Sequence, residues 1–508
     1  MSGVPTLADA LAEVARKHPH RPAVVTGDRR LTYAELLRRA ERLAPALAGR
    51  AATVARCAAD VAVTVVAATI ADVALLVADA RASDDERNRA WSLFRADRLV
   101  TSDGEALTVA GLGDGPVTCD GDRLTVARPG GDGGPACFPP GRGAAATLPP
   151  GPAGLGLSTS GSEGWPKCVE RPWPTVTANA RAFAAALELS PGEVVACTTP
   201  PHHSYALCGG IVTTLAAGGT YVALDRQPGP RTVADAVDRH RVAVLLSVPL
   251  LYRWFSAAGL TTRHRPRLCV SAGAPLPPED RHRWAAAVGW RIGEHYGTSE
   301  HGMLTLDTGS VAGSVGRPIA GVTLVVDPAP GPGDVLVACA GPPPRLHTGD
   351  VAPGEPATGD AVSADATTGD VTTAGHPPGG DGLQPTGDVG RLDADGRLYL
   401  LGRRGGTLNV AGNKVPAAEV EDALRQFAAV RDCAVVGAPG PGGAQEVVAF
   451  VETVRELDHR ELYAFLHGRL AAYKVPARVV VVDRLPRNVN GKLLRSELLR
   501  GLAAGAWR

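Results

Sequence analysis

Hydrophobic positions at the start of the chain follow a helical spacing, and they predict two helices separated by a short strand over residues 6–48. Leu7 and Leu11 are four residues apart, so they fall on one face of the first helix. Thr32 is followed by Glu35 three residues later, which is the pattern of a capping box and predicts the start of the second helix.

The most apolar stretch of the chain covers residues 61–78. This stretch and its flanks are divided by Asp60, Asp72 and Asp79 into pieces that are too short to span a bilayer. The stretch is therefore predicted to form a buried strand and a buried helix instead of a membrane segment.

Helical and strand patterns alternate from residue 172 to about residue 325, which favours an α/β architecture with buried strands. The clearest segments are a helix at 176–187, apolar strands at 242–248 and 267–271, and a helix at 279–288. After residue 387 a second series predicts strands at 397–401, 432–436 and 446–453 and helices at 417–426 and 460–470. This series describes a compact α+β unit of about a hundred residues, a normal size for a small domain.

Glycine and proline change this picture in two stretches. The chain has 61 Gly and 42 Pro among 508 residues, which exceeds the usual share but is too low for a wholly disordered protein. Much of the excess lies in residues 111–154 and 326–385. We expect loop and edge structure at 115–154 and a solvated loop at 326–385. The tripeptide Thr-Gly-Asp occurs at 348–350, 358–360, 368–370 and 386–388, and low-complexity drift in a solvated loop explains this better than a true repeat.

Basic and acidic side chains are balanced, with 52 of each. This balance argues against a general surface for nucleic acid or for an anionic membrane. The nine cysteines include no Cys-x-x-Cys pair, so we expect reduced thiols in a cytoplasmic protein and neither a zinc module nor a disulfide framework. No secretory signal is expected at the N-terminus.

The segment 157–167 places small and hydroxyl-bearing residues between an apolar approach and Lys167. Small residues let a backbone approach a ligand closely, and hydroxyls, consecutive N–H groups and a lysine can hold phosphate oxygens. The segment is neither a Walker loop nor a dinucleotide-binding fingerprint, and taken alone it is more often an ordinary loop. The candidate phosphate-binding residues are Ser158, Thr159, Ser160, Gly161 and Ser162.

A second polar segment covers residues 294–302. Tyr296 can stack on a base that Gly297 lets approach, Ser299 can contact a phosphate, and Glu300 can hold a hard cation such as Mg²⁺. By itself the segment is equally consistent with a polar turn after a strand.

A third segment, 386–403, contains Asp388, whose carboxylate can accept two hydrogen bonds from a vicinal diol such as ribose. Asp395 and Gly396 are typical of a hairpin turn, and a plain surface hairpin is the simpler interpretation of the segment alone.

A fourth segment, 485–495, has the Pro, Asn and Gly residues of a tight turn, and this turn presents Lys492. A single exposed lysine is normally a solvated surface charge, so this segment alone assigns no function.

The four segments together resemble the adenylate-forming superfamily, which includes acyl- and aryl-CoA ligases, adenylation domains and luciferases. The resemblance covers essentially the whole chain, because the motifs stand in the family's order and approximate spacing. It rests on the loop ending in Pro-Lys at 166–167, Tyr-Gly-x-Ser-Glu at 296–300, Thr-Gly-Asp at 386–388, Gly-Arg at 402–403 and Asn-Gly-Lys at 490–492. Only the last Thr-Gly-Asp stands at the family's distance before Gly-Arg.

The resemblance implies an α/β fold with a large N-terminal AMP-binding domain at 1–402, including a low-complexity loop at about 340–385. A small mobile α+β domain at 403–508 would carry the catalytic Lys492. The family joins ATP to a carboxylate, giving an acyl-adenylate and pyrophosphate, and a thiol or another nucleophile then displaces AMP. The small domain swings between the two steps.

The resemblance also assigns roles to residues. The 158–162 loop with Lys167 would hold pyrophosphate, and Lys492 would bridge the carboxylate and the α-phosphate. Ser299 would contact the α-phosphate, and Glu300 would bind Mg²⁺. Asp388 and Arg403 would bind the ribose. The residues around adenine would be Tyr296, Gly297, Gly273, Ala274 and Pro275. His203 and Tyr205 would line a pocket for a flat aromatic or small acid.

Three residues depart from the family pattern. Glu163 replaces a small hydroxyl residue, and Gly405 and Asn409 replace the usual hinge residue and lysine. Adenylation is therefore better supported than transfer to CoA.

Several functions stay open at this stage. The main hypothesis is an ATP-dependent, AMP-forming acid–thiol ligase that acts on a small, aromatic carboxylic acid with Mg²⁺ and with CoA as a possible co-substrate. The acceptor of a related enzyme would be an amine, a carrier protein or, with nitrite as the activated acid, an aromatic amine in secondary metabolism. A nucleotide-binding protein without catalysis is disfavoured by Lys492 and Glu300. No nucleic-acid or membrane partner is expected.

Overall fold

The computed structural model describes most of the chain. The described residues are 6–80, 82, 84–102, 106–111, 117–120, 123–126, 152–160, 166–224, 228–274, 276, 278–309, 311, 313–327, 333–347, 382–403, 407–410, 413–440, 445–486 and 495–503. None of the described helices combines the length and the apolar character that crossing a bilayer requires.

A first nine-stranded sheet has the order β17-β16-β15-β14-β13-β11-β12-β1-β2. Its strands are β1 (Pro22–Thr26), β2 (Arg29–Thr32), β11 (Val194–Cys197), β12 (Thr220–Ala223), β13 (Val244–Ser247), β14 (Leu268–Ser271), β15 (Ile292–Thr298), β16 (Gly302–Asp307) and β17 (Arg317–Pro318). The strands from β1 to β15 in this order pair in parallel, and β2, β16 and β17 are antiparallel additions at the two edges.

A second nine-stranded sheet has the order β20-β10-β9-β4-β3-β5-β6-β7-β8. Its strands are β3 (Arg50–Ala55), β4 (Ala74–Asp79), β5 (Arg98–Ser102), β6 (Ala106–Gly111), β7 (Val117–Asp120), β8 (Arg123–Val126), β9 (Gly154–Ser160), β10 (Pro166–Pro172) and β20 (Arg345–His347). The central strands β5, β3, β4 and β9 are parallel, whereas β10 folds back on β9 as an antiparallel hairpin.

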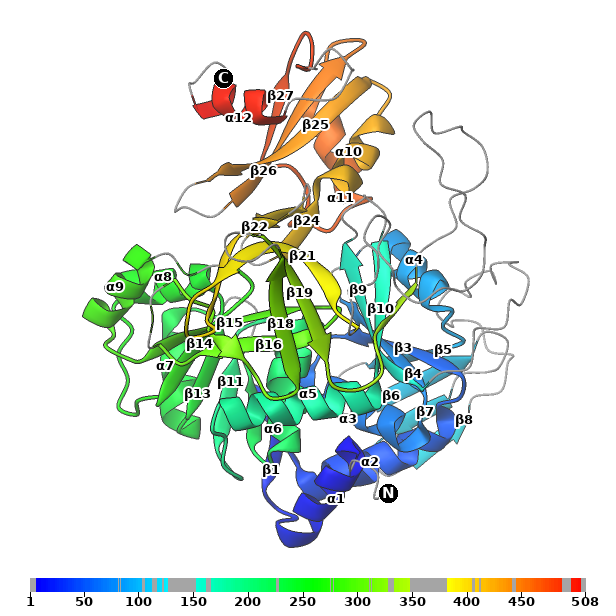
Figure 1. Cartoon of the computed structure of the whole chain (residues 1–508). Helices are drawn as coiled ribbons and strands as arrows, with labels where there is room; N and C mark the ends of the chain where they lie inside the picture. Colours follow the sequence, from blue (N-terminus) through cyan, green and yellow to red (C-terminus); the bar gives the residue numbers. More distant parts are fainter. Residues whose placement is uncertain are drawn as a thin grey trace.

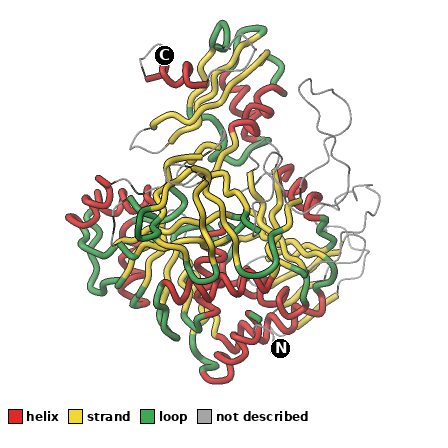
Figure 2. The backbone as a smooth tube through the Cα atoms, viewed as in Figure 1, coloured by secondary structure: helices red, strands yellow, loops and turns green. Residues whose placement is uncertain are grey.

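Helices cover both faces of the two sheets, so the large domain is layered (Figures 1 and 2). The first core cluster joins the inner faces of both sheets through α1 (Leu7–Lys17), α2 (Tyr33–Leu43), α3 (Ala58–Ala71), α5 (Trp173–Ala186), the π-helix η2 (Tyr205–Val212) and α6 (Thr213–Ala216). On the outer face of the first sheet lie α7 (Pro230–His240), α8 (Pro249–Ala257) and α9 (Pro278–Ala287), and α4 (Asp84–Phe94) covers the second sheet. Because consecutive strand residues face opposite sides, Leu245 and Leu246 of β13 belong to different clusters.

A four-stranded antiparallel sheet links this domain to the C-terminal part of the chain. It contains β18 (Val322–Asp327), β19 (Gly333–Cys339), β21 (Gln384–Leu392) and β22 (Leu398–Arg403). A short 3-10 helix, η1 (Ala44–Ala46), follows α2 in the large domain. Its apolar face packs against Tyr296 and Leu304 of the first sheet.

The small C-terminal domain stands above the sheets in Figure 1. It consists of the hairpin β23 (Thr407–Val410) and β24 (Asn413–Pro416), the sheet β25 (Val430–Pro439), β26 (Gln445–Thr453) and β27 (Arg478–Val481), and the helices α10 (Ala417–Arg425), α11 (His459–His467) and α12 (Arg495–Ala503). Helices α10 and α11 pack on one face of its sheet, and α12 packs on the other. This arrangement confirms the predicted fold class, α/β with a small α+β C-terminal domain.

Most of the predicted elements are present. The Thr32–Glu35 capping box closes with both of its hydrogen bonds, and the apolar stretch forms α3 and β4. One expectation was wrong, because residues 326–385 contain β19 and β20 as well as loop. Val335 and Val337 of β19 are fully buried, but Gly and Pro on both sides obscure their alternation in the sequence. Residues 348–381, which contain three of the Thr-Gly-Asp copies, lie outside the described part.

Candidate active site

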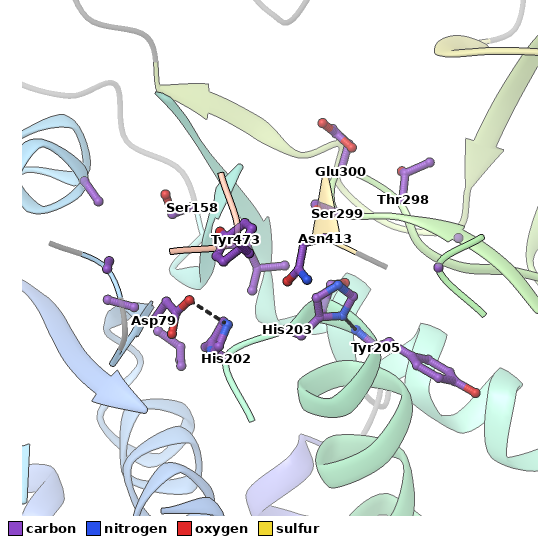
Figure 3. Close-up of a pocket in the computed structure, with 18 of the residues that line it drawn as sticks. Asp79, Ser158, His202, His203, Tyr205, Thr298, Ser299, Glu300, Asn413 and Tyr473 are labelled. Carbon is purple, nitrogen blue, oxygen red and sulfur yellow. Dashed lines mark hydrogen bonds and ion pairs between the residues drawn. The ribbon is translucent and has the colours of Figure 1, made fainter. Parts of the chain in front are cut away.

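A cavity of about 210 Å³ lies where the two large sheets meet the C-terminal domain (Figure 3). Seven of the predicted site residues line it, from segments that are far apart in the sequence. These are Ser158, His203, Tyr205, Gly273, Gly297, Ser299 and Glu300.

The predicted phosphate-binding loop is the hairpin of β9 and β10. The Cα register pairs Thr159 with Lys167 and Ser160 with Pro166, so these predicted residues lie on two adjacent antiparallel strands. Ser158 is exposed at the cavity wall. Gly161 and Ser162, as well as the departure at Glu163, lie outside the described residues, and the side chains of Thr159 and Ser160 are not described.

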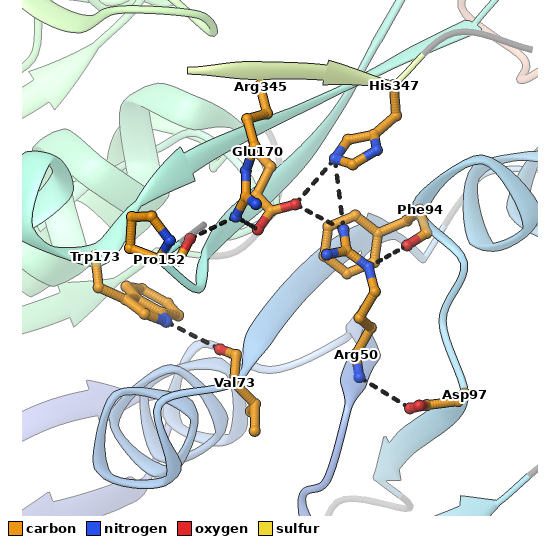
Figure 4. Close-up of polar contacts among 9 residues, drawn as sticks. All are labelled: Arg50, Val73, Phe94, Asp97, Pro152, Glu170, Trp173, Arg345 and His347. Carbon is orange, nitrogen blue, oxygen red and sulfur yellow. Dashed lines mark hydrogen bonds and ion pairs between the residues drawn. The ribbon is translucent and has the colours of Figure 1, made fainter. Parts of the chain in front are cut away.

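A buried carboxylate anchors the second arm of this hairpin (Figure 4). Glu170 of β10 is fully buried and accepts hydrogen bonds from Arg50 of β3 at 2.7 Å and from Arg345 of β20 at 2.7 Å, with His347 at 2.9 Å. Burial alone would raise the pKa of Glu170, but His347, Arg50 and Arg345 outweigh it and hold the pKa below its usual value. The charge of Glu170 therefore ties three strands of the second sheet together.

Two predicted nucleotide-binding residues, one on β15 and one on β21, are in contact. The Tyr296 hydroxyl donates to the Asp388 Oδ2 atom at 2.7 Å. Asp388 stands opposite Arg403 in the register of β21 and β22, although the Arg403 side chain is not described. The described contact thus joins the segment at 296–300 to the Thr-Gly-Asp at 386–388.

The backbone at Gly297 must come close to the next strand. A Cβ added there would overlap the carbonyl oxygen of Gly302 across the irregular pairing of β15 and β16. Glycine is therefore required at 297, as expected for a position where a ligand and a backbone both approach.

The loop after β14 is held by a carboxylate that the sequence argument did not single out. Glu294 accepts from the backbone N–H of Leu276 at 3.0 Å and from Arg281 at 2.7 Å, and burial raises its pKa. These bonds fix the chain that carries Gly273 and Ala274, whereas Pro275 lies outside the described residues.

Ser299 and Glu300 occupy the turn after β15. His301 donates its backbone N–H to the Thr298 hydroxyl at 3.1 Å, and its ring contacts Gln384 at 3.0 Å. Among the described residues no group of three His, Cys, Asp or Glu side chains could hold a metal. Glu300 would fit Mg²⁺ as a single protein ligand, because Mg²⁺ commonly takes its remaining oxygens from phosphates and water.

Histidines and tyrosine form the deep side of the cavity. The Tyr205 hydroxyl donates to the carbonyl of Val270 at 2.9 Å, and burial raises its pKa. The backbone N–H of Tyr205 donates to His203 Nδ1 at 3.3 Å. His295, which the sequence argument missed, also lines this side.

The C-terminal domain supplies a wall of the cavity that was not predicted. Asn413, Glu419, Tyr473 and Lys474 line it together with Glu86 of α4. Lys474 Nζ lies 2.8 Å from Glu86 and 2.7 Å from Glu419. Although burial alone would lower it, the two carboxylates raise the pKa of Lys474, so the lysine stays charged.

A second unpredicted pair lies on the large-domain side of the same cavity. His202 Nε2 is 3.3 Å from Asp79 at the end of β4, as Figure 3 shows. Lys492, the predicted catalytic lysine, and Gly405 lie outside the described residues. The placement of Lys492 therefore stays a prediction.

Comparisons with known proteins agree with this geometry. The AMP-binding enzyme family matches residues 11–337, and the AMP-binding enzyme C-terminal domain matches residues 419–492. Feruloyl-CoA synthase from Amycolatopsis sp. is 31% identical over 514 residues, covering 96% of this chain and 97% of the relative. Triostin synthetase I from Streptomyces triostinicus is 30% identical over 542 residues, covering 99% and 95%. A solved malonyl-CoA ligase complex with methylmalonyl-CoA and AMP has a TM-score of 0.73 and 27% identity, covering 94% of this chain and 99% of that one.

Proposed function

Because this chain belongs to the AMP-binding enzyme family and is an ATP-dependent, AMP-forming ligase, we propose that it adenylates a small aromatic carboxylic acid and passes the acyl group to CoA. One observation carries the proposal: residues of separate predicted motifs, from Ser158 to Glu300, line a single cavity. The name of the feruloyl-CoA relative supports an aromatic acid, as do the rings of His203 and Tyr205 in the cavity wall.

In the proposed first step, a carboxylate oxygen attacks the α-phosphorus of ATP. The new P–O bond forms as the bond to pyrophosphate breaks. Glu300 holds Mg²⁺ and Ser299 contacts the α-phosphate, while Lys167 and the 158–162 loop contact the leaving pyrophosphate. Lys492 stabilises the negative charge that develops at the reacting oxygens.

The nucleotide is held on the other side of the cavity. Tyr296 and Gly297 contact adenine together with the 273–275 loop. Asp388 and Arg403 bind the ribose, an assignment that their facing positions in β21 and β22 support.

In the proposed second step, the CoA sulfur attacks the acyl carbon. The bond from that carbon to the AMP oxygen breaks, and the thiol proton leaves with the released products. We propose that the C-terminal domain, residues 403–508, changes its orientation relative to residues 1–402 between the steps. The similar malonyl-CoA ligase is named for a CoA product, and this supports CoA as the acceptor.

A different acceptor is the second candidate for this step. Gly405 and Asn409 replace residues that the family uses at the hinge and in the hairpin, and this favours an acceptor other than CoA. That acceptor is an amine, a carrier protein or, where nitrite is the activated acid, an aromatic amine. The proposal includes a cytoplasmic location. None of the seven cysteines whose side chains the structure describes forms a disulfide, which supports it because disulfides are rare in reducing compartments.

A product assay tests the first step. We expect AMP and pyrophosphate from ATP, Mg²⁺ and a panel of aromatic acids, and ADP with phosphate would refute adenylation. Lys492→Ala should lower pyrophosphate release at least 100-fold, whereas Lys17→Ala, a change in an exposed helix ion pair, should leave it unchanged. Nucleotide binding without any product would favour the non-catalytic alternative.

The acceptor is tested separately. Consumption of CoA with stoichiometric AMP release would support the ligase. If CoA is not consumed, amines, carrier proteins and nitrite with aromatic amines are compared as alternatives, and the acceptor that raises AMP release replaces CoA in the proposal.

A further inference from the structure

His295 lies on the deep side of the cavity, inside strand β15. Its side chain is buried between two aromatic rings, with ring centroids 4.8 Å from Phe183 and 5.6 Å from Tyr205. His295 and Gly297 both line the cavity, although the register of β15 against β16 shifts between Tyr296 and Gly297. The imidazole is therefore part of the cavity wall next to the turn that carries Ser299 and Glu300.

The hydrogen bonding of His295 fixes its tautomer. Its Nδ1 atom is 2.8 Å from the carbonyl oxygen of Thr305 on β16. A carbonyl oxygen only accepts hydrogen bonds, so Nδ1 carries the proton. In a neutral imidazole the other nitrogen, Nε2, is then an acceptor. Burial lowers the pKa of His295 to about 4, so the ring is neutral near pH 7.

Gly297 lies against the acceptor edge of this ring. A Cβ added at Gly297 would lie 3.0 Å from His295 Cε1 and 3.1 Å from Nε2. Glycine at 297 therefore leaves room beside the Nε2 edge of a ring that lines the cavity. A buried hydrogen-bond acceptor that loses its water without gaining a donor costs free energy. A ligand that brings an N–H or O–H group to the cavity is therefore favoured over one that does not.

His203 has the opposite tautomer in the same cavity. Because the backbone N–H of Tyr205 donates to its Nδ1 atom, the neutral ring carries its proton on Nε2 and can donate. One imidazole of the cavity is thus arranged to donate and the other to accept. A carboxylic acid with a hydrogen-bond acceptor at one end and a hydrogen-bond donor at the other matches this pair of histidines.

We propose that His295 is a specificity-determining residue that accepts a hydrogen bond from a hydroxyl or amino substituent on the acid. The inference rests on the proposed function, because it assumes that the acid occupies this cavity. It narrows the substrate class from small aromatic acids to those that carry a hydrogen-bond donor.

The test compares acids that differ only in the substituent. Benzoate and cinnamate are offered unsubstituted and with hydroxyl, amino or methoxy groups at each ring position, and kcat/KM for pyrophosphate release is measured. The methoxy acids match the hydroxyl acids in carrying oxygen but donate no hydrogen bond. We expect the best hydroxyl or amino acid to exceed its methoxy and unsubstituted counterparts at least tenfold in the unaltered enzyme.

Two variants assign this preference to His295. His295→Leu removes the acceptor, so the ratio of donor-bearing to unsubstituted acid should fall to about one. His295→Gln keeps an acceptor, so most of the ratio should remain. Because the readout is a ratio within each variant, a general loss of activity does not imitate the result.

Distinct outcomes separate this inference from the proposed function. Equal use of all acids by the unaltered enzyme, or a preference that survives in His295→Leu, overturns the role of His295 while leaving adenylation intact. If no acid yields AMP and pyrophosphate, the proposed function fails, and the inference fails with it. If His295→Leu does not fold, His295→Phe, which also removes the acceptor, takes its place, and a preference that survives in it overturns the role of His295.

Discussion

The contact between Glu86 and Lys474 is predicted to control how the C-terminal domain closes the cavity. Glu86 belongs to α4 of the large domain, whereas Lys474 and Glu419 both belong to the C-terminal domain. The pair Lys474–Glu419 therefore lies within the C-terminal domain, and Glu86 is the partner in the large domain. Glu86→Gln keeps the size of the side chain and removes only the charge that crosses the boundary.

The structure sets the size of the effect. At an effective dielectric constant of about 20, unit charges 2.8 Å apart attract each other by roughly 6 kcal/mol before desolvation is subtracted. Hydrogen bonds to charged groups contribute about 1.5–3 kcal/mol net. Because Lys474 keeps Glu419, the variant leaves no unpaired charge on the lysine, and we expect a loss of about 2 kcal/mol in docking. This corresponds to a roughly 30-fold fall in the docked fraction.

The assay measures the two half-reactions separately. Acid-dependent exchange of pyrophosphate into ATP reports adenylation, and AMP release from preformed acyl-adenylate after acceptor addition reports transfer. The docked domain places Asn413 and Tyr473 in the cavity wall. We propose that this orientation serves the transfer step, so we expect transfer to slow about 30-fold and exchange to change much less.

The control is Glu446→Gln, which removes an ion pair with Arg478 inside the C-terminal domain at 2.8 Å. It should leave both half-reactions unchanged. If Glu86→Gln slows both steps equally, or slows neither more than the control does, the reasoning about the interdomain contact is wrong.

Two other changes follow from the geometry. Gly297→Ala should lower pyrophosphate release about 100-fold, because its Cβ would displace the strand at Gly302 and shift the turn that carries Glu300; near-normal kinetics would contradict this. Glu170→Gln should lower the free energy of unfolding at pH 7 by about 3 kcal/mol, because it leaves Arg50 and its neighbours without their carboxylate. Since the folded-state pKa of Glu170 is lowered, its contribution is complete above the unfolded value near 4.5 and is lost as the pH falls through the folded value. Urea unfolding at pH 7 and below pH 4 should therefore show a difference between the two proteins that shrinks on acidification, and a constant difference would contradict it.

The parts of the molecule that could be predicted depend on local or evenly spaced signals. The capping box at Thr32 needs only residues within one helical turn. Asp388 and Arg403 were linked because the family resemblance places Thr-Gly-Asp at a set distance before Gly-Arg, and the two residues face each other in the register of β21 and β22. In both cases the sequence separation is short enough for the pattern to reveal the contact.

The parts that could not be predicted are contacts between distant segments. Glu86 and Lys474 are 388 residues apart, and nothing near either residue marks it as part of a buried pair. Glu170 lies 120 residues from Arg50 and 175 from Arg345, so its cluster exists only after β3, β10 and β20 have aligned. Charged residues are normally read as solvated, and only tertiary structure shows which of them are buried with partners.

His295 combines both kinds of information. Its position in the Tyr296 motif drew attention to the segment, but its role depends on a carbonyl of the next strand and on rings from α5 and η2. The carbonyl of Thr305 decides which nitrogen of His295 carries the proton. The position of this proton then decides whether the ring offers the cavity a hydrogen-bond donor or a hydrogen-bond acceptor. Substrate preference in this chain is therefore a property of the tautomer, and the tautomer is set by a β15–β16 register that the motif alone does not specify.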